Sequence, residues 1–126
     1  MKRYLLDTHV AYWWMTGSKK LSKSTAQLIS ASPCAVSVAS IWEMQLKNSL
    51  GKLALPSDPL HLHFLAEGFS VLPITAEHVE RAREMRGLHN DPFDSLIIAI
   101  ADLERLTLLT KDSTILSLGL KHILEA

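Results

Sequence analysis

Residues 2–9 have the sequence KRYLLDTH, in which a short apolar run ends at an acidic residue. We predict a buried strand over Lys2–Leu6 and a turn at Asp7. A helix should follow and end at Gly17, because glycine readily adopts the left-handed conformation that closes helices. A strand that passes through an acidic turn into a helix is typical of an α/β fold.

The same succession of strand and helix continues along the chain. Further strands are predicted at Cys34–Val38, Phe69–Leu72, Thr107–Leu109 and Lys121–Leu124. Further helices are predicted at Ser22–Ser30, from about Ser40, at Leu60–Ala66, from Thr75, at Pro92–Leu106 and at Ser113–Leu118, with a loop at Gly87–Asn90. Because strands alternate with helices, we expect an α/β fold with a mainly parallel sheet.

Length and composition indicate one globular domain. The chain has 126 residues, of which 48% are hydrophobic and 21% charged, and we expect a single domain over residues 1–126. Cys34 is the only cysteine, so no disulfide can form within the chain, and a cytoplasmic location fits. The longest strongly apolar run, Leu96–Ala101, is too short to span a membrane, and no targeting segment is visible.

The charge is balanced, with 13 basic and 13 acidic residues. Proteins that bind nucleic acid are often basic overall, so any RNA affinity must come from a local basic patch or from a bound metal ion. Among the scattered basic residues, Lys111 is best placed to contact RNA, because it precedes Asp112. A net charge of zero also favours self-association.

Acidic residues follow the predicted strands at the points where each strand ends. Asp7 follows the first strand, Glu43 lies in the first turn of the helix after the second, and Asp112 follows the fourth. In parallel α/β sheets, ligands bind at the carboxyl ends of the strands, so these three acids should share one edge. Asp94, near the start of the buried helix, joins them only if that helix begins at the same edge.

Each of these acids also has a structural explanation. Asp7 and Asp112 could cap helices, and Asp91 could cap the helix that contains Asp94. Ser40-Ile-Trp-Glu43 matches the capping-box pattern. Taken together, however, clustered carboxylates repel one another unless a cation lies between them, and Mg²⁺ prefers oxygen ligands. The residues alone leave the metal site and the helix caps equally open.

Two other functions fit an acidic pocket on an α/β fold. One is a phosphotransfer enzyme or phosphatase, although an aspartate-based phosphatase needs a second aspartate where this chain has His9. The other is a non-catalytic interaction module, in which apolar helix faces and tryptophans bind a partner. The sequence has no glycine-rich phosphate loop, and His61 and His63 are wrongly spaced for a zinc site on one helical face.

Four segments, in this order, resemble the PIN-domain family and, within it, the VapC-type toxins of bacterial toxin–antitoxin pairs. They are YLLDTH (residues 4–9), SIWE (40–43), HNDPFD followed by LIIA (89–94 and 96–99), and LLTKD (108–112). The resemblance covers essentially the whole chain. It implies a three-layer α/β/α sandwich around a parallel sheet of about five strands.

The resemblance also implies a metal-dependent ribonuclease. Its catalytic and metal-binding residues would be Asp7, Glu43, Asp94 and Asp112, with Asp91 in a secondary position. The cofactor would be Mg²⁺, with Mn²⁺ as a substitute. The implied partners are an RNA substrate, a second copy of the chain in a homodimer, and a neutralising antitoxin that docks near the active site.

Overall fold

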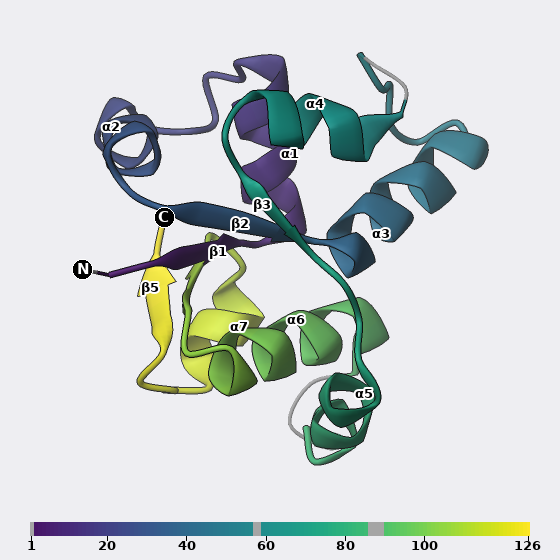
Figure 1. Cartoon of the computed structure of the whole chain (residues 1–126), viewed down its shortest axis with the longest axis vertical. Coiled ribbons are helices and arrows are strands. Elements are labelled where there is room, and N and C mark those ends of the chain that lie inside the picture. Colours follow the sequence, from purple (N-terminus) through teal and green to yellow (C-terminus); the bar gives the residue numbers. More distant parts are fainter. Residues whose placement is uncertain (1, 57–58, 86–89) are drawn as a thin grey trace.

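In the computed structural model, which describes residues 2–56, 59–85 and 90–126, a five-stranded parallel sheet forms the centre (Figure 1). The strands are β1 (Tyr4–Leu6), β2 (Cys34–Ser37), β3 (Ser70–Leu72), β4 (Thr107–Thr110) and β5 (Ile123–Glu125). Their order in the sheet is β3-β2-β1-β4-β5. Every neighbouring pair is parallel, as the alternation of strands and helices predicts.

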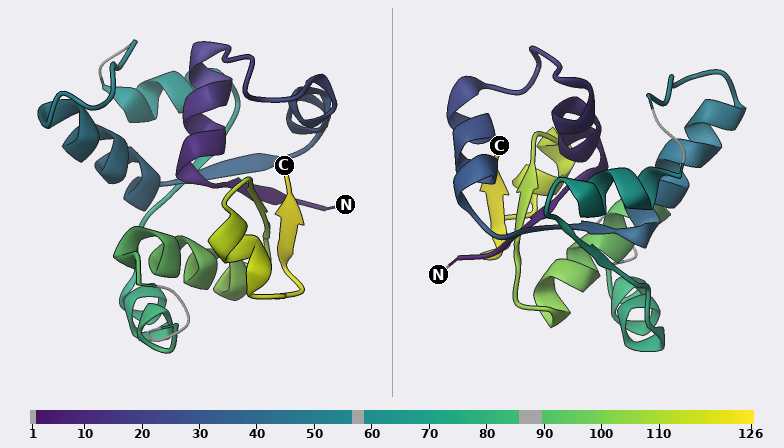
Figure 2. Two further views of the ribbon diagram at one scale, coloured as in Figure 1. Left: turned by 180° about the vertical axis from the view of Figure 1, so that it is seen from behind. Right: turned by 45° about the horizontal axis from the view of Figure 1, so that its top comes forward.

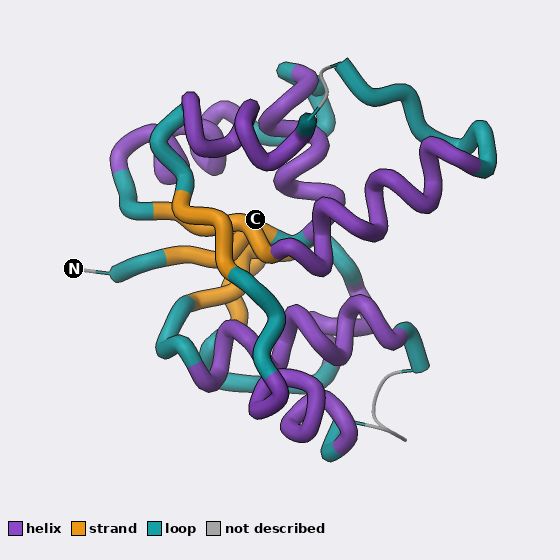
Figure 3. Tube along the Cα trace, turned by 45° about the vertical axis from the view of Figure 1, so that its right-hand side comes forward, coloured by secondary structure: helices purple, strands orange, loops and turns teal. Residues whose placement is uncertain are grey.

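Helices cover both faces of this sheet. They are α1 (Thr8–Thr16), α2 (Lys23–Ala31), α3 (Val38–Ser49), α4 (Leu60–Ala66), α5 (Ala76–Arg83), α6 (Pro92–Leu103) and α7 (Ser113–Ser117). Figures 1 and 2 show α1, α2 and α4 on one side of the sheet and α5, α6 and α7 on the other. Figure 3 shows α3 extending outward from the end of the sheet. The predicted three-layer sandwich is therefore confirmed.

The central strands β1 and β4 are apolar and largely buried on both faces, because helices cover each face of the sheet. Leu6 and Leu109 belong to the core that includes α1 and α4, whereas Leu5 and Leu108 belong to the core that includes α6 and α7. Successive side chains of a strand point to opposite faces. Short apolar runs without polar alternation are therefore the expected sequence of these strands.

The strand order reverses beside the central strand. From β1 the chain first builds β2 and β3 on one side, and later builds β4 and β5 on the other. The register pairs Leu6 of β1 with Leu109 of β4, so these two strands end together. A reversal of strand order is where ligands bind in open α/β sheets, and here Asp7 and Asp112 follow the two strands that flank it.

Several predicted boundaries agree with the structure. α4 has the predicted bounds, and α1 ends at Gly17, which has a φ of 64°. The first strand begins at Tyr4 rather than at Lys2. The helix predicted to run to Leu106 ends at Leu103, because the chain turns through Arg105, which has a φ of 57°, before β4 begins. Most of the loop predicted at 87–90 lies outside the described residues.

The capping box predicted at Ser40 and Glu43 is wrong. α3 begins earlier, at Val38, and its N-cap is Ser37, whose Oγ accepts a hydrogen bond of 2.9 Å from the N–H of Ala39. Serine is a favourable N-cap at either position, so the pattern alone does not choose between them. Glu43 consequently lies in the second turn of α3 and not in the first.

Within the described part of the chain, no helix is long and apolar enough to cross a membrane.

Candidate active site

Asp7 is fixed at the end of the central strand by hydrogen bonds to both of its carboxylate oxygens. Oδ1 accepts a bond of 2.8 Å from the N–H of Thr8, which makes Asp7 the N-cap of α1. Oδ2 accepts a bond of 2.6 Å from the hydroxyl of Thr110. Burial raises the pKa of Asp7, and these two hydrogen bonds oppose the shift by favouring the carboxylate.

Thr110 connects two of the predicted acids. While its hydroxyl donates to Asp7, its Oγ1 accepts a bond of 3.0 Å from the backbone N–H of Asp112. Asp112 in turn caps α7, because its Oδ1 accepts a bond of 3.0 Å from the N–H of Ile115. The structure thus joins Asp7 and Asp112, as the shared sheet edge predicts, through a fully buried threonine.

Glu43 approaches the same edge from α3. The hydroxyl of Thr8 donates a 3.0 Å bond to Oγ of Ser40, which holds the start of α1 against the first turns of α3. Glu43 is buried, and its Oε2 lies 3.1 Å from Nζ of Lys47. Its other oxygen, Oε1, is buried without a hydrogen-bond partner. A buried oxygen of this kind is costly unless a ligand or cation satisfies it.

Asp94 enters the cluster from the first turn of α6. Asp91 caps this helix by accepting bonds of 2.9 Å and 3.1 Å from the N–H groups of Phe93 and Asp94. Burial raises the pKa of Asp94 to about 8, and the negative charges of Asp7, Asp91, Asp112 and Glu43 add to the increase. The other three predicted acids therefore all act on Asp94, because α6 begins at the edge where β1 and β4 end.

These side chains fit a hard divalent cation. They provide only oxygen donors, and Oε1 of Glu43 is buried without a partner. The pKa of Asp94 is raised first by burial and then by neighbouring negative charge, which a cation would offset. In the described ranges, no three histidine, cysteine or acidic side chains are already arranged to hold a metal ion. Oxygens of Asp7 and Asp112 already accept helix-capping hydrogen bonds. Repulsion between the carboxylates opposes their closer approach unless a cation lies between them.

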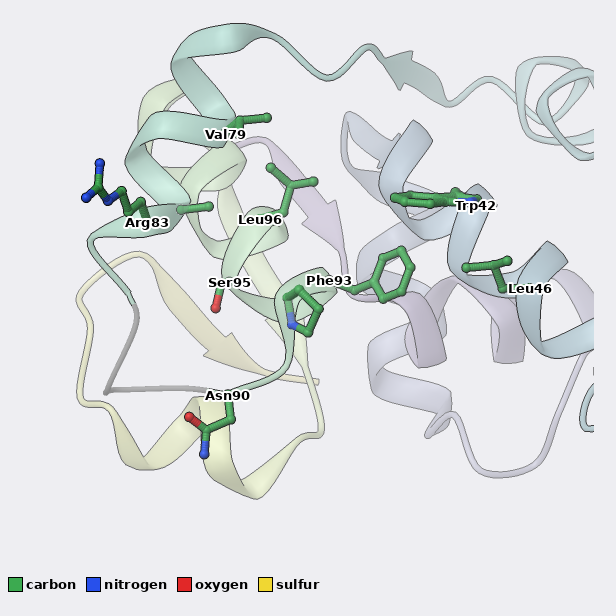
Figure 4. Close-up of a pocket in the computed structure, with 10 residues that line it drawn as sticks. Trp42, Leu46, Val79, Arg83, Asn90, Phe93, Ser95 and Leu96 are labelled. Carbon is green, nitrogen blue, oxygen red and sulfur yellow. The ribbon is translucent and has the colours of Figure 1, made fainter.

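A groove of about 850 Å³ lies next to the acidic cluster, between α3, α5 and α6 (Figure 4). Its lining side chains include Trp42, Leu46, Val79, Phe93 and Leu96. Trp42 packs edge-on against Phe93 with 5.0 Å between the ring centroids. These two aromatic residues directly precede Glu43 and Asp94 in the chain, so the groove and the acids share two helices.

Some side-chain contacts near the site were not predicted from the sequence, and a pair on α3 and a contact of α5 are examples. The pair between Glu43 and Lys47 has the i,i+4 spacing of helical ion pairs, so the sequence contains a signal for it. The second is a 2.9 Å hydrogen bond from Nε2 of His78, which is buried, to Oε2 of Glu104. His78 lies in the first turn of α5, where its Nδ1 accepts from the N–H of Thr75. No local signal predicts its partner.

Comparison with known families decides the classification. The PIN domain family model matches residues 4–119. This chain belongs to the PIN-domain family. The resemblance of its four segments to that family is thereby confirmed. In this PIN domain, the family match includes all four acids and the strands and helices that position them.

Individual relatives agree with this classification. Ribonuclease VapC22 of Mycobacterium tuberculosis is 34% identical over 115 residues, which are 89% of this PIN domain and 88% of that protein. A toxin-antitoxin complex from Klebsiella pneumoniae contains a chain with a TM-score of 0.70 and 22% identity, covering 96% of this chain and 95% of that one. VapBC2 from Rickettsia felis, bound to a promoter DNA fragment, gives a TM-score of 0.67 at 19% identity, covering 98% and 97%.

Proposed function

We propose that this PIN domain is a metal-dependent endoribonuclease and the toxin of a toxin–antitoxin pair. The observation that carries the proposal is the position of Asp94, whose pKa is raised to about 8 by burial and by the negative charges of four other acids. These are Asp7, Asp91, Asp112 and Glu43. Ionised carboxylates this close together repel one another unless a cation offsets their charge. A relative at 34% identity is named as a ribonuclease, which supports RNA as the substrate.

The ion would be Mg²⁺, with Mn²⁺ as a substitute, and Asp7, Glu43, Asp94 and Asp112 would hold it. When bound, it supplies Lewis-acid activation of water and neutralises charge at the phosphate. The protein's contribution is to hold the donors in place. Thr110 and the N–H of Thr8 orient the carboxylate of Asp7.

Asp94 would exchange a proton for the metal ion. With a pKa of about 8 it carries a proton in much of the metal-free protein near neutral pH, and a cation would displace that proton. Glu43 would contribute through Oε1, because Oε2 is already paired with Lys47. The burial of these two acids keeps their charges out of bulk water, which strengthens their interaction with a cation.

The test is RNA cleavage by purified protein with Mg²⁺, with Mn²⁺ and with EDTA, for the wild type and for Asp7→Asn and Asp94→Asn. Asp102→Asn is the matched control, because Asp102 is a half-exposed aspartate that pairs with Arg81 at the far end of α6. We expect the wild type to cleave RNA only when the metal is present. Asp102→Asn should retain this cleavage, whereas Asp7→Asn and Asp94→Asn should lose it. Equal cleavage by the site variants would contradict the proposal.

We further propose that a neutralising antitoxin binds this protein in the cytoplasm. Solved structures with the same fold are toxin–antitoxin complexes, which supports a protein partner. Purification of the chain from its native cells, followed by identification of a bound protein that inhibits the RNA cleavage, tests this. Free protein that cleaves RNA but has no such inhibitor would argue against it.

We also propose that the protein forms a homodimer through the groove between α3, α5 and α6. Trp42 is 51% exposed and Val79 is 54% exposed on opposite walls of the groove, beside the partly exposed Leu46. Exposed apolar patches of this kind are typical of interaction surfaces. The net charge of zero reduces repulsion between two copies.

A further inference from the structure

Lys47 lies one helical turn beyond Glu43 on α3, at the rim of the acidic cluster. Its Nζ is 3.1 Å from Oε2 of Glu43. The side chain of Lys47 is 33% exposed, whereas that of Glu43 is only 8% exposed. The ammonium group is therefore positioned between a buried carboxylate and the solvent through which a substrate arrives.

Lys47 can leave Glu43 and pair with another anion. Ion pairs with a partly exposed member contribute little to stability, and the lysine side chain is flexible and carries a compact charge. Glu43 still has an unpaired buried oxygen, so a cation in the cluster would satisfy its charge without Lys47. The ammonium group of Lys47 would then remain at the rim of the cluster, and Glu43 would no longer require it as a partner.

Lys111, a second basic residue near this edge, is placed differently. Lys111 was expected to contact RNA because it precedes Asp112. In the structure its Nζ lies 3.9 Å from Glu125 of β5, and both side chains are well exposed. It is held towards the outer strand of the sheet, whereas Lys47 contacts one of the four acids directly.

We propose that Lys47 binds a backbone phosphate of the RNA, leaving Glu43 as the substrate enters the acidic cluster. This inference rests on the proposed ribonuclease function. A cluster of carboxylates repels a polyanion, and the chain has no net positive charge to offset that repulsion. A lysine at the rim supplies the missing attraction at the position where the strand must approach.

The experiment measures the affinity for a short single-stranded RNA of mixed sequence by fluorescence anisotropy over a range of salt concentrations. Ca²⁺ replaces Mg²⁺ because it takes the same kind of oxygen ligands, and gel electrophoresis checks that the RNA stays intact. The variants are Lys47→Met, which keeps the alkyl chain, and Lys47→Arg, which keeps the charge. Lys23→Met is the matched control, since Lys23 is exposed on α2, at the opposite end of the sheet from α3 (Figure 1).

We expect Lys47→Met to weaken RNA binding about three- to ten-fold at low salt. It should also reduce the slope of log affinity against log salt by about 0.7, the value for one lost phosphate contact on a single strand. Lys47→Arg and Lys23→Met should retain the wild-type slope. Affinity for Mn²⁺ without RNA, measured by titration, should not fall in Lys47→Met.

Two outcomes would overturn the inference while the wild type still binds and cleaves RNA. One is an unchanged salt slope in Lys47→Met. The other is a loss of Mn²⁺ affinity that matches the loss of RNA affinity, because Lys47 would then act only through Glu43. If the wild type neither binds nor cleaves RNA, the ribonuclease proposal itself fails. Failure of the Lys47 inference alone is recognised because the wild type then still binds and cleaves RNA.

Discussion

The hydroxyl of Thr110 donates a 2.6 Å hydrogen bond to Oδ2 of Asp7, although 103 positions separate the two residues in the chain. The same oxygen of Thr110 accepts the backbone N–H of Asp112. One buried hydroxyl therefore satisfies a carboxylate just after β1 and a backbone group beyond β4. This bond ties the two strands together at the point where the strand order reverses.

Replacement of Thr110 by valine should destabilise the protein by about 1–3 kcal/mol, because a buried carboxylate and a partly buried N–H both lose their partner while the volume stays nearly the same. Urea denaturation measures this difference. Thr110→Ser keeps the hydroxyl and should recover much of the loss. If valine and serine destabilise the protein equally, the cause is the lost methyl contact and not the hydrogen bond.

The metal-free protein should lose stability as the pH rises from about 4 to about 8. An unfolded aspartate has a pKa of about 3.9, whereas that of Asp94 in the folded protein is raised to about 8. Between these values the folded state holds a proton that the unfolded state has lost. The free energy of unfolding therefore decreases with pH by about 1 kcal/mol per pH unit and becomes level above the folded pKa.

Urea denaturation in EDTA at several pH values checks this dependence. Asp94→Asn has no proton to lose, so its free energy of unfolding should change less with pH than that of the wild type. Asp102→Asn, at the far end of the same helix, should retain the wild-type dependence. Identical pH profiles for the wild type and Asp94→Asn would show that Asp94 does not carry this proton.

The groove predicts how the oligomeric state responds to substitution. Val79→Glu places a charge on the wall formed by α5 and should convert a dimer into a monomer because the charge would be buried at the interface. Light scattering after size-exclusion chromatography measures the mass. Val79→Ala is the control and should at most weaken the dimer. A wild type that is monomeric at all concentrations tested would contradict this assignment of the surface.

The sequence predicted a shared sheet edge for Asp7 and Asp112 because a general rule places them there. In a parallel sheet, residues that directly follow a strand share one edge, so Asp7 and Asp112 needed no contact information. Asp94 was conditional on where α6 begins, and Asp91-Pro92 indicated the start of that helix but not its location. Only the packed structure shows that this start lies beside β1 and β4.

Contacts between residues far apart in the chain could not be predicted from the sequence. The bond from Thr110 to Asp7 depends on the register that pairs Leu6 with Leu109, and the two apolar strands, YLL and TLLT, do not specify that register by themselves. The N-cap of α3 was misplaced for a different reason. Ser37 and Ser40 are both suitable caps, and the choice depends on where β2 stops pairing with its neighbours.

The most direct test of the central claim, that these four carboxylates hold a divalent cation, is anomalous diffraction from crystals of the protein grown with Mn²⁺. The account predicts an anomalous peak bounded by the carboxylates of Asp7 and Asp94, near Glu43 and Asp112, that is absent from crystals of Asp94→Asn. Manganese bound only elsewhere, or absent from crystals of protein that cleaves RNA in the same buffer, would contradict it.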